Sequence, residues 1–414
     1  MKKLLFGFAA LAMLGVHAEL KDKIYKYMPL EKDLSVYSAN GTVSMDAVFR
    51  RNSKALTFHF KESAPNVPRF TKNGLLMEHG GKDRERGAVN ILPADGKIFS
   101  PAGKKTAGIY NDGFEFSGTW ELNPIKLIPM LNGKHILSFY AKGKGTLTIN
   151  SFLKIKATGL EKALPAETFA LSGEWKRYYF QFDGGVAKQP ANFAESFRAK
   201  FQGENVVISA PMLEGPAVYP NVSTPTTYIA PGSYRDAERF YLPGLKPEMG
   251  LAGAVAFSFT PTSKCGWSDL FSTDGGWRPE IECSYRYYSK HAFRYQVAFR
   301  KKQIWTKNAL FELGKTYQVV VNWDKEKFAI WVDGKKLGEV KAPGKPFTKK
   351  LIYIGSRSIQ AFAEGCFRNF TLFDQTLTDA EIQEFTKDPD LSKKLPKKEI
   401  SRITPFVSTP LTRG

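Results

Sequence analysis

Two carboxylates stand two residues apart in the segment PEIECSYR, at Glu280 and Glu282. Side chains at this spacing point to the same face of a β-strand. A retaining glycoside hydrolase needs two carboxylates close together, one as nucleophile and one as acid/base. The E-x-D-x-x-E pattern of such enzymes requires a third acidic residue, and the sequence has Tyr285 there. The pair is therefore an incomplete hydrolase signature.

The following segment, HAFRYQVAFRK (291–301), contains the residue types that a polysaccharide lyase would use. Such an enzyme needs a His or Tyr base, and Arg and Gln side chains that bind the carboxylate of a uronate sugar. Arg294 and Gln296 share one face of a strand, with His291 close by, so we treat Arg294 and Gln296 as carbohydrate-binding candidates. Such sets arise often in a basic, Tyr-rich chain, and no Ser-His-Asp spacing, phosphate loop or dinucleotide fingerprint is visible. We expect no catalytic residues.

Aromatic residues beside polar ones indicate the binding of a sugar without cleavage. The C–H face of a pyranose stacks on an aromatic ring, and its hydroxyls form hydrogen bonds with Asp, Asn, Gln or Arg. The segment YNDGFEFSGTWELNP (110–124) has this mixture and supplies the candidates Tyr110, Asp112 and Trp120. The same mixture also suits the edge of an ordinary β-sandwich.

A loop-rich stretch, residues 265–288, supplies two further candidates, Trp267 and Trp277. The alternative interpretation is that these aromatic residues pack under a disulfide. Cys265 and Cys283 are the nearest pair in sequence, and an oxidising compartment would favour their pairing. The chain has three cysteines, so the sequence leaves the pairing open.

Trp331 is a candidate because of its phase within a strand. In FAIWV (328–332), Phe328, Ile330 and Val332 alternate as one face of a strand should. Trp331 is out of phase with them and is expected on the opposite face of the sheet. There it would be a stacking platform, unless another segment covers it.

The N-terminus predicts export. A basic start precedes the uncharged apolar run of residues 4–16, which is short for a membrane span, and Val16-His17-Ala18 resembles a cleavage site. We expect a signal peptide over residues 1–18 with cleavage near Ala18. The protein would then be secreted or extracytoplasmic, in the periplasm or at the cell surface, with no transmembrane segment.

The formal net charge of +20 narrows the class of partner. A basic exported protein suits anionic partners such as acidic polysaccharides, although a solvated basic surface without a dedicated partner explains the charge equally well. No recognition helix or RNA-binding strand motif is visible, so we expect no nucleic-acid partner. The sequence leaves the oligomeric state open.

Alternation of apolar and polar residues dominates the chain, and long helical periodicity is nearly absent. Many short strands separated by Gly, Asp, Asn and Pro predict an all-β fold with two tandem β-sandwich (jelly-roll) domains. A short C-terminal helix is expected near residues 376–385, with Thr378 as its N-cap. The expected strands are residues 57–60, 136–141, 146–152, 177–182, 205–210, 254–259, 317–323, 328–332 and 351–356.

Residues 71–235 contain GKHILSFYAKGKGTLTI (133–149) followed by SGEWKRYYFQFDGG (172–185). With these motifs in this order, the segment resembles the carbohydrate-binding-module-like jelly rolls of exported bacterial proteins. This resemblance implies a sugar-binding sandwich whose matching residues are mostly scaffold. The matching residues are Glu78, Asn90, Ser138, Phe139, Lys142, Gly143, Trp175, Arg177, Tyr178, Leu213, Glu214 and Tyr228.

Residues 236–388 contain AGAVAFSFTPTS (252–263), LGKTYQVVVNWDKEKFAIWVDGKKLGEV (313–340) and AEGCFRNFTLFDQTLTDAEIQEF (363–385). On these motifs the segment resembles the laminin-G-like, concanavalin-A-like jelly roll. This resemblance implies a fold that hosts lectins as well as hydrolases and lyases. Related folds often carry calcium, yet no Asp- or Asn-rich ligand spacing here demands it, so the metal content is unknown.

The sequence thus predicts two sandwiches with flanking segments. Residues 19–70 are expected to be strands that pack on the first sandwich, and residues 389–414 a disordered basic tail. The function that fits is that of an exported, non-catalytic carbohydrate-binding protein at the cell surface or in extracellular matrix, acting on polysaccharide or glycan, including acidic polysaccharide. The alternatives are a structural or adhesive surface protein that makes protein contacts, and a lyase or hydrolase on the same scaffold.

Overall fold

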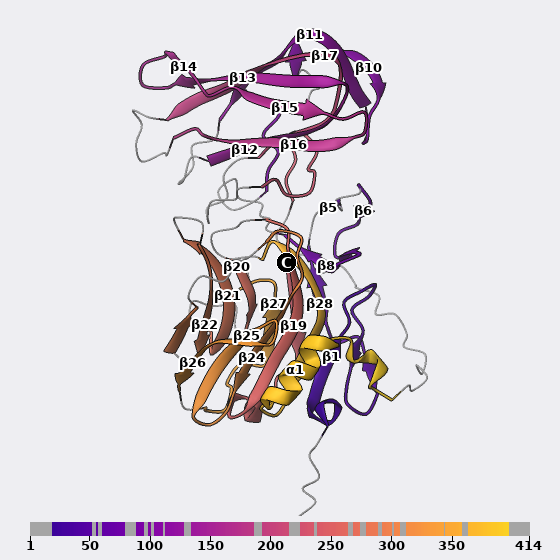
Figure 1. Cartoon of the computed structure of the whole chain (residues 1–414), viewed down its shortest axis with the longest axis vertical. Coiled ribbons are helices and arrows are strands. Elements are labelled where there is room, and N and C mark those ends of the chain that lie inside the picture. The colour runs from indigo at the N-terminus through magenta and orange to yellow at the C-terminus, as the bar shows by residue number, and fades with distance from the viewer. Residues whose placement is uncertain are drawn as a thin grey trace, which may run out of the picture.

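The computed structural model describes residues 19–396, with gaps. The described chain is mostly β-strand with one α-helix, which confirms the predicted all-β class. Figure 1 shows two β-sandwiches arranged along the long axis of the molecule. The predicted signal peptide lies outside the described residues, as do residues 52–54, 57–59, 79–87, 95–97, 101–102, 111, 128–133, 186–192, 215–223, 236–237, 264–267, 274–278, 289–291, 300–301, 307–311, 343, 358–362 and 397–414.

The N-terminal sandwich is built from one sheet that bends over itself. Its longest strand, β17, pairs with β13 along its first half and with β12 along its second half, so it runs through both layers. The pairing of β17 with β11 is interrupted by a β-bulge beside Gly118, whose positive φ suits a bend. The strands described here are β9 (Phe99–Ser100), β10 (Lys104–Ala107), β11 (Asp112–Lys126), β12 (Lys134–Lys142), β13 (Gly145–Ile155), β14 (Glu161–Ala163), β15 (Glu167–Leu171), β16 (Lys176–Asp183) and β17 (Ala194–Glu214).

The C-terminal sandwich consists of two sheets. One has the order β26-β25-β24-β19-β28-β1-β2-β3, with β8 added to β28 and β7 to β8. These strands are β1 (Ile24–Met28), β2 (Val36–Tyr37), β3 (Val43–Ser44), β7 (Arg69–Thr71), β8 (Gly74–Met77), β19 (Gly253–Pro261), β24 (Tyr317–Trp323), β25 (Lys327–Val332), β26 (Lys335–Lys341) and β28 (Gly365–Phe373).

The facing sheet has the order β23-β22-β21-β20-β27-β18-β4. Its strands are β4 (Val48–Arg50), β18 (Arg239–Pro243), β20 (Ser268–Ser272), β21 (Ile281–Tyr288), β22 (Ala292–Phe299), β23 (Lys302–Trp305) and β27 (Leu351–Ile354). A separate hairpin pairs β5 (Ala55–Leu56) with β6 (Glu62–Ser63). The predicted strands fall within β12, β13, β16, β17, β19, β24 and β25, and the one at residues 351–356 extends two residues beyond the end of β27. Residues 57–60 lie largely outside the described residues.

The two sandwiches are nested in the chain. The prediction that residues 19–70 pack on the first sandwich is wrong for most of the segment, because β1 pairs with β28 and β4 pairs with β18. The region of the β5–β6 hairpin does pack there, since the ring of Phe60 lies 5.1 Å from the ring of Tyr140 in β12. The predicted start of the first sandwich at residue 71 is also wrong, since β8 pairs with β28 as well. Strands β1 to β4, β7 and β8 therefore build one sandwich together with strands β18 to β28, and the other sandwich is inserted between them.

The C-terminal helix and the start of the tail cover the outer face of the ten-stranded sheet. Helix α1 (Asp379–Lys387) begins at the predicted N-cap Thr378, whose side chain accepts a hydrogen bond from the backbone N–H of Glu381. The tail is not wholly disordered as predicted, because η4 (Leu391–Lys393) packs with Leu391 fully buried. Two other short 3₁₀ segments are described, η1 (Leu20–Lys23) and η3 (Pro247–Gly250).

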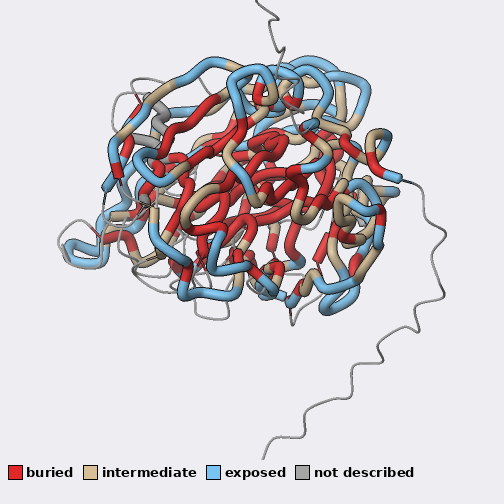
Figure 2. Tube along the Cα trace, turned by 90° about the horizontal axis from the view of Figure 1, so that it is seen from below, coloured by how far each residue is buried: buried red, intermediate tan, exposed pale blue. Residues whose placement is uncertain are grey.

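Burial divides the apolar residues into clusters that follow these layers. Figure 2 shows the buried residues gathered in the interior of the molecule, with exposed residues around its rim. One cluster fills the C-terminal sandwich and another fills the N-terminal sandwich. A third lies between the ten-stranded sheet and α1. A small fourth cluster lies at the junction of the sandwiches, and it includes Tyr228 and Ile229.

Candidate functional site

Trp120 is part of the core of the N-terminal sandwich, which corrects its prediction as a sugar platform. Its side chain is only 1% exposed. Its ring stacks on Phe99 and Phe116 at centroid distances of 3.6 and 5.0 Å. A ring enclosed in this way offers no face to a ligand.

Trp331 lies on the face that the alternation predicts, but that face is covered. Its neighbours Phe328 and Ile330 belong to the main core of the C-terminal sandwich, whereas Trp331 belongs to the cluster beneath α1. The side chain is 6% exposed, and the ammonium group of Lys336 lies 5.0 Å from the ring centroid. A helix that packs on the outer face thus makes Trp331 a buried residue and not a platform.

Five of the predicted site residues have side chains that lie outside the described part of the structure. Arg294 and Gln296 lie in β22, opposite Arg286 and Ser284 of β21, and Asp112 begins β11, but these three candidate side chains lie outside the described set. The candidates Trp267 and Trp277 lie outside the described residues altogether.

The predicted disulfide is not seen. Cys283 is a free cysteine that is fully buried in the core of the C-terminal sandwich. Burial, with a contribution from the charge of Asp269, raises the pKa of its thiol well above the usual value. Cys265 lies outside the described residues, and because Cys283 is free, the predicted Cys265–Cys283 bridge is not formed in this structure.

The carboxylates of the hydrolase-like pair have partners in the structure. Glu282 is buried and forms an ion pair with Arg357, whose Nε also lies 2.9 Å from Oδ2 of Asp269. Glu280 accepts hydrogen bonds from the backbone N–H groups of Thr348 and Lys349, at 2.9 and 3.1 Å. Both side chains therefore have a role in holding strands and loops together.

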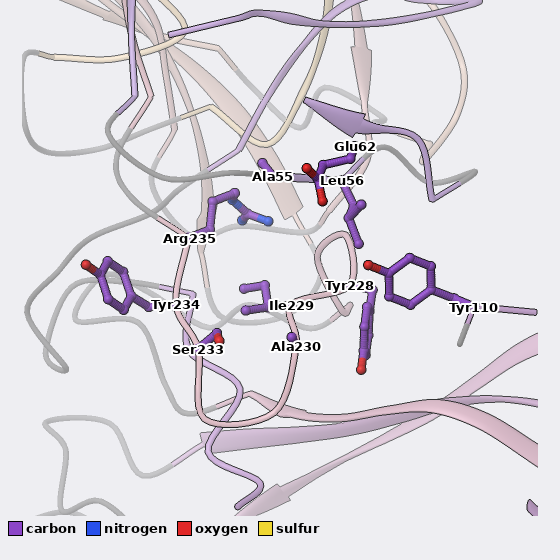
Figure 3. Close-up of a pocket in the computed structure, with 10 residues that line it drawn as sticks. All are labelled: Ala55, Leu56, Glu62, Tyr110, Tyr228, Ile229, Ala230, Ser233, Tyr234 and Arg235. Atoms are coloured by element: carbon purple, nitrogen blue, oxygen red, sulfur yellow. The ribbon is translucent and has the colours of Figure 1, made fainter. Parts of the chain in front are cut away.

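Among the predicted residues whose side chains the structure describes, Tyr110 lines a pocket. This pocket, which we call the junction pocket, lies where the two sandwiches meet and has a volume of about 310 Å³. Figure 3 shows residues from three parts of the chain around it: the β5–β6 hairpin, Tyr110, and the connecting segment of residues 228–235. Its lining consists of Ala55, Leu56, Glu62, Tyr110, Tyr228, Ile229, Ala230, Ser233, Tyr234 and Arg235.

Aromatic rings form one side of the junction pocket. The rings of Tyr110 and Tyr228 meet edge to face at a centroid distance of 5.4 Å, and Phe60 stacks on Tyr110 at 5.0 Å. Burial raises the pKa of Tyr228 to about 12, so its hydroxyl is neutral and can donate a hydrogen bond at neutral pH. Tyr234, on the other side of the pocket in Figure 3, is 40% exposed.

A buried network of charges lies behind the junction pocket. Glu78 and Glu238 stand where the chain leaves the C-terminal sandwich and where it returns, and the backbone N–H of Glu78 donates to Glu238 Oε2 at 3.0 Å. Arg69 joins them, with Nη1 2.6 Å from Glu78 Oε2 and Nη2 2.7 Å from Glu238 Oε1. Arg51 pairs with Glu238 at 2.8 Å, and Arg235 pairs with Glu78 at 3.1 Å. The network thus fixes the two chain crossings to each other.

Hydrogen bonds extend this network to the segment that lines the pocket. Thr227 donates its backbone N–H to Glu78 Oε1 at 2.8 Å, and its hydroxyl accepts a hydrogen bond from Arg235 at 2.9 Å. Although burial alone would raise it, the positive charges of Arg235 and Arg69 lower the pKa of Glu78 to about 2. The carboxylate is therefore ionised at neutral pH and anchors the lining segment.

Sequence reasoning missed most of the junction pocket. Tyr234 and Arg235 fell at the boundary between the two predicted sandwiches, in the Pro- and Gly-rich stretch of residues 223–250 that links them. Glu62 fell in the flanking segment of residues 19–70, and Tyr228 was assigned to the scaffold. A signal that could have found them is the pair of adjacent residues Tyr234 and Arg235 inside an otherwise Pro- and Gly-rich linker. Their convergence with Tyr110 depends on the path that the chain takes from the inserted sandwich back to the C-terminal sandwich. Local sequence patterns contain no information about this path.

Neither a cluster of metal ligands nor a membrane-spanning helix is found among the described residues. In that part of the chain, no three His, Cys, Asp or Glu side chains lie together as a metal site would require. Nor does any helix described there have the length and apolar character needed to cross a membrane.

Comparison with solved structures gives matches to β-sandwich proteins at low identity. A heptameric SAP-like pentraxin from Limulus polyphemus is 16% identical, with 33% of this chain and 69% of that chain covered and a TM-score of 0.26. Domain 4 of the extracellular arabinanase AbnA from Geobacillus stearothermophilus, in complex with arabinotriose, is 10% identical, with coverage of 36% and 73% and a TM-score of 0.29. Likenesses of this size carry no functional argument.

A third solved structure is the CBM40 domain of the Ruminococcus gnavus IT-sialidase, bound to α2,3-sialyllactose. It is 13% identical, with 35% of this chain and 93% of that chain covered and a TM-score of 0.28. The search of curated proteins found no match.

The family comparison bears on the C-terminal sandwich. The matching family, Laminin_G_3, is described as the concanavalin A-like lectin/glucanases superfamily, and the match begins just before β19 and ends within α1. It confirms the resemblance of this half and leaves the strands contributed by residues 19–78 outside it. Residues 250–383, less than half of the chain, are thus similar to the concanavalin A-like lectin/glucanases superfamily.

Proposed function

We propose that this chain is an exported, non-catalytic carbohydrate-binding protein that acts at a cell surface or in extracellular matrix, with the junction pocket as its glycan site. The observation that carries the proposal is the convergence of Tyr110, Tyr228 and Tyr234 with Ser233 and Arg235 around one pocket. The similarity of residues 250–383 to a superfamily of lectins and glucanases supports the same class of ligand.

The chemistry of the lining suits a sugar. The ring of Tyr234, which is 40% exposed, offers a face on which the C–H groups of a pyranose can stack, beside the partly buried ring of Tyr110. Hydroxyl, carboxylate and guanidinium groups of the lining can bind the hydroxyls of the sugar. The volume of about 310 Å³ lies at the lower end of the range for small-ligand sites. The pocket therefore fits one or two sugar rings of a longer glycan.

The partners of Glu280 and Glu282 support a non-catalytic role. Glu282 is buried against Arg357, and Glu280 is bonded to two backbone N–H groups. A retaining hydrolase needs its two carboxylates free to act on the sugar. Export is proposed on the pattern of residues 1–18, and the net charge of +20 would draw the protein to anionic polymers.

A glycan array with acidic and neutral polysaccharides, probed with the full chain at two salt concentrations, tests this proposal. We expect binding that persists at the higher salt and weakens about tenfold in Tyr110→Ala and Tyr234→Ala, because each substitution removes a stacking face. Tyr179→Ala is the matched control, since Tyr179 is also 40% exposed but does not line the pocket.

Two results would contradict the proposal. Silence over the whole array would favour the structural or adhesive role, in which the sandwiches make protein contacts. Binding that vanishes with salt and is unchanged in Tyr234→Ala would reduce the interaction to adhesion of a basic surface to anionic polymers.

A further inference from the structure

Resting on the proposed function, we infer that the junction pocket recognises a sugar acid, and that the carboxylate of this sugar lies at the Arg235 end of the pocket. The proposal names the chemical class of the ligand: a pyranose ring that carries a carboxylate, as an oligosaccharide or a residue within a polysaccharide. It rests on the place of Arg235 in the pocket wall and on how its charge is shared.

Arg235 brings a positive charge to the pocket wall. Figure 3 shows its guanidinium directed between the β5–β6 hairpin and Ile229, toward the middle of the labelled residues. The side chain is only 1% exposed. A charge in such surroundings is poorly screened by water, so it acts on a ligand in the pocket more strongly than a surface lysine would.

The carboxylates of the network are shared between guanidinium groups. Glu78 Oε2 lies 2.6 Å from Arg69 and 3.1 Å from Arg235, so one negative charge faces two positive ones. Glu238 is likewise shared by Arg69 and Arg51, at 2.7 and 2.8 Å. Arg235 is the guanidinium of this set that lines the pocket, where it is held by Glu78 and by a hydrogen bond from its Nη1 to the hydroxyl of Thr227.

The pocket also contains one acidic group, Glu62. This side chain is exposed, at the start of strand β6. Water screens an exposed charge, so Glu62 weakens the attraction for an anion without cancelling it. Its carboxylate can accept hydrogen bonds from the hydroxyls of the same sugar. The pocket thus combines rings for the sugar face with groups for its carboxylate and its hydroxyls.

Isothermal titration calorimetry with matched ligands tests the inference without altering the buried network. The probes are oligosaccharides of galacturonic, glucuronic and mannuronic acid, each compared with its carboxyl-reduced counterpart at physiological salt. We expect the full chain to bind at least one acid about tenfold more tightly than its reduced form, since a charge-assisted interaction is lost on reduction.

Protein variants locate that preference. Glu62→Gln should bind the acid about twofold more tightly, and Tyr234→Ala should bind it about tenfold more weakly. Lys162→Ala, a change at an exposed residue of β14 in the N-terminal sandwich, is the charge control and should change neither value. Binding of the acid that is unchanged in Tyr234→Ala would place it on the general surface and overturn the inference.

The two proposals fail in different ways. Equal binding of acid and reduced forms, weakened in Tyr234→Ala, would overturn the sugar-acid inference and leave glycan binding at the junction pocket intact. Binding of neither form would overturn the sugar-acid inference, and the glycan array then decides whether any glycan binds.

Discussion

The two sandwiches differ in how the chain builds them. The N-terminal sandwich is continuous: β9 to β17 follow one another between residues 99 and 214. The C-terminal sandwich is assembled from two distant segments, and β1 pairs with β28 from the other end of the chain. The inserted sandwich therefore leaves and re-enters its host at one place, the same place that holds the buried charges and the junction pocket. The connections between the two sandwiches, more than either sheet, therefore create the candidate site.

Separating the two sandwiches should give the largest effect. A fragment of residues 88–235 keeps all of β9 to β17 and should fold cooperatively. A fragment of residues 250–396, which contains the whole family match, lacks β1 and β8 of one sheet and β18 and β4 of the other, and should not, because its sheets would be left with unpaired edges. Urea unfolding followed by near-UV circular dichroism checks this. A cooperative transition in the second fragment would contradict the nested arrangement.

Breaking the charge network should weaken the junction strongly. Glu238→Gln leaves the guanidinium groups of Arg51 and Arg69 buried with weaker partners, and the loss of a buried ion pair costs about 3–5 kcal/mol. The free energy of unfolding from urea titration measures it. Glu62→Gln is the control, because an exposed carboxylate contributes roughly 0–1 kcal/mol. A loss below about 1 kcal/mol in Glu238→Gln would mean that the network does not hold the sandwiches together.

The pH dependence of stability tests the contribution of Glu78 to the same charge network. The pKa of Glu78 is about 2 in the folded chain against an ordinary value of 4.5, so its contribution is complete above pH 4.5 and is lost as the pH falls toward 2. A shift of this size corresponds to roughly 3 kcal/mol. Urea unfolding at pH 7, 4 and 3 should show this loss in the intact chain and less of it in Glu78→Gln. Equal pH profiles for the two proteins would contradict the assignment.

The smallest expected effect concerns the helix that covers only the C-terminal sandwich. Thr378→Ala removes the N-cap of α1, where the Thr378 side chain and Glu381 form a reciprocal capping box. We expect a loss of about 1 kcal/mol in the free energy of unfolding. The effect should be seen in the intact chain and should leave glycan binding unchanged. An effect on binding would show that α1 contributes to the site.

Local patterns predicted much of the fold and little of the site. The alternation in residues 328–332 placed Trp331 on the correct face, because strand periodicity is a local property. It could not show that α1 covers this face, nor that Trp120 packs inside a sandwich, since both depend on distant segments. Two other features also depend on distant segments: β1 pairs with β28, and Tyr110 and Arg235 line the same pocket. Such contacts follow from how the whole chain folds and are not encoded in the spacing of nearby residues.

The measurement that tests the central claim most directly is hydrogen–deuterium exchange of the full chain, with and without the tightest glycan from the array. If the junction pocket is the glycan site, added glycan should slow exchange in peptides that cover Ala55, Tyr110 and the segment from Tyr228 to Arg235, while peptides of β13 and β26 stay unchanged. Slower exchange confined to β21 and β22 would place the site on the C-terminal sandwich instead and contradict the account.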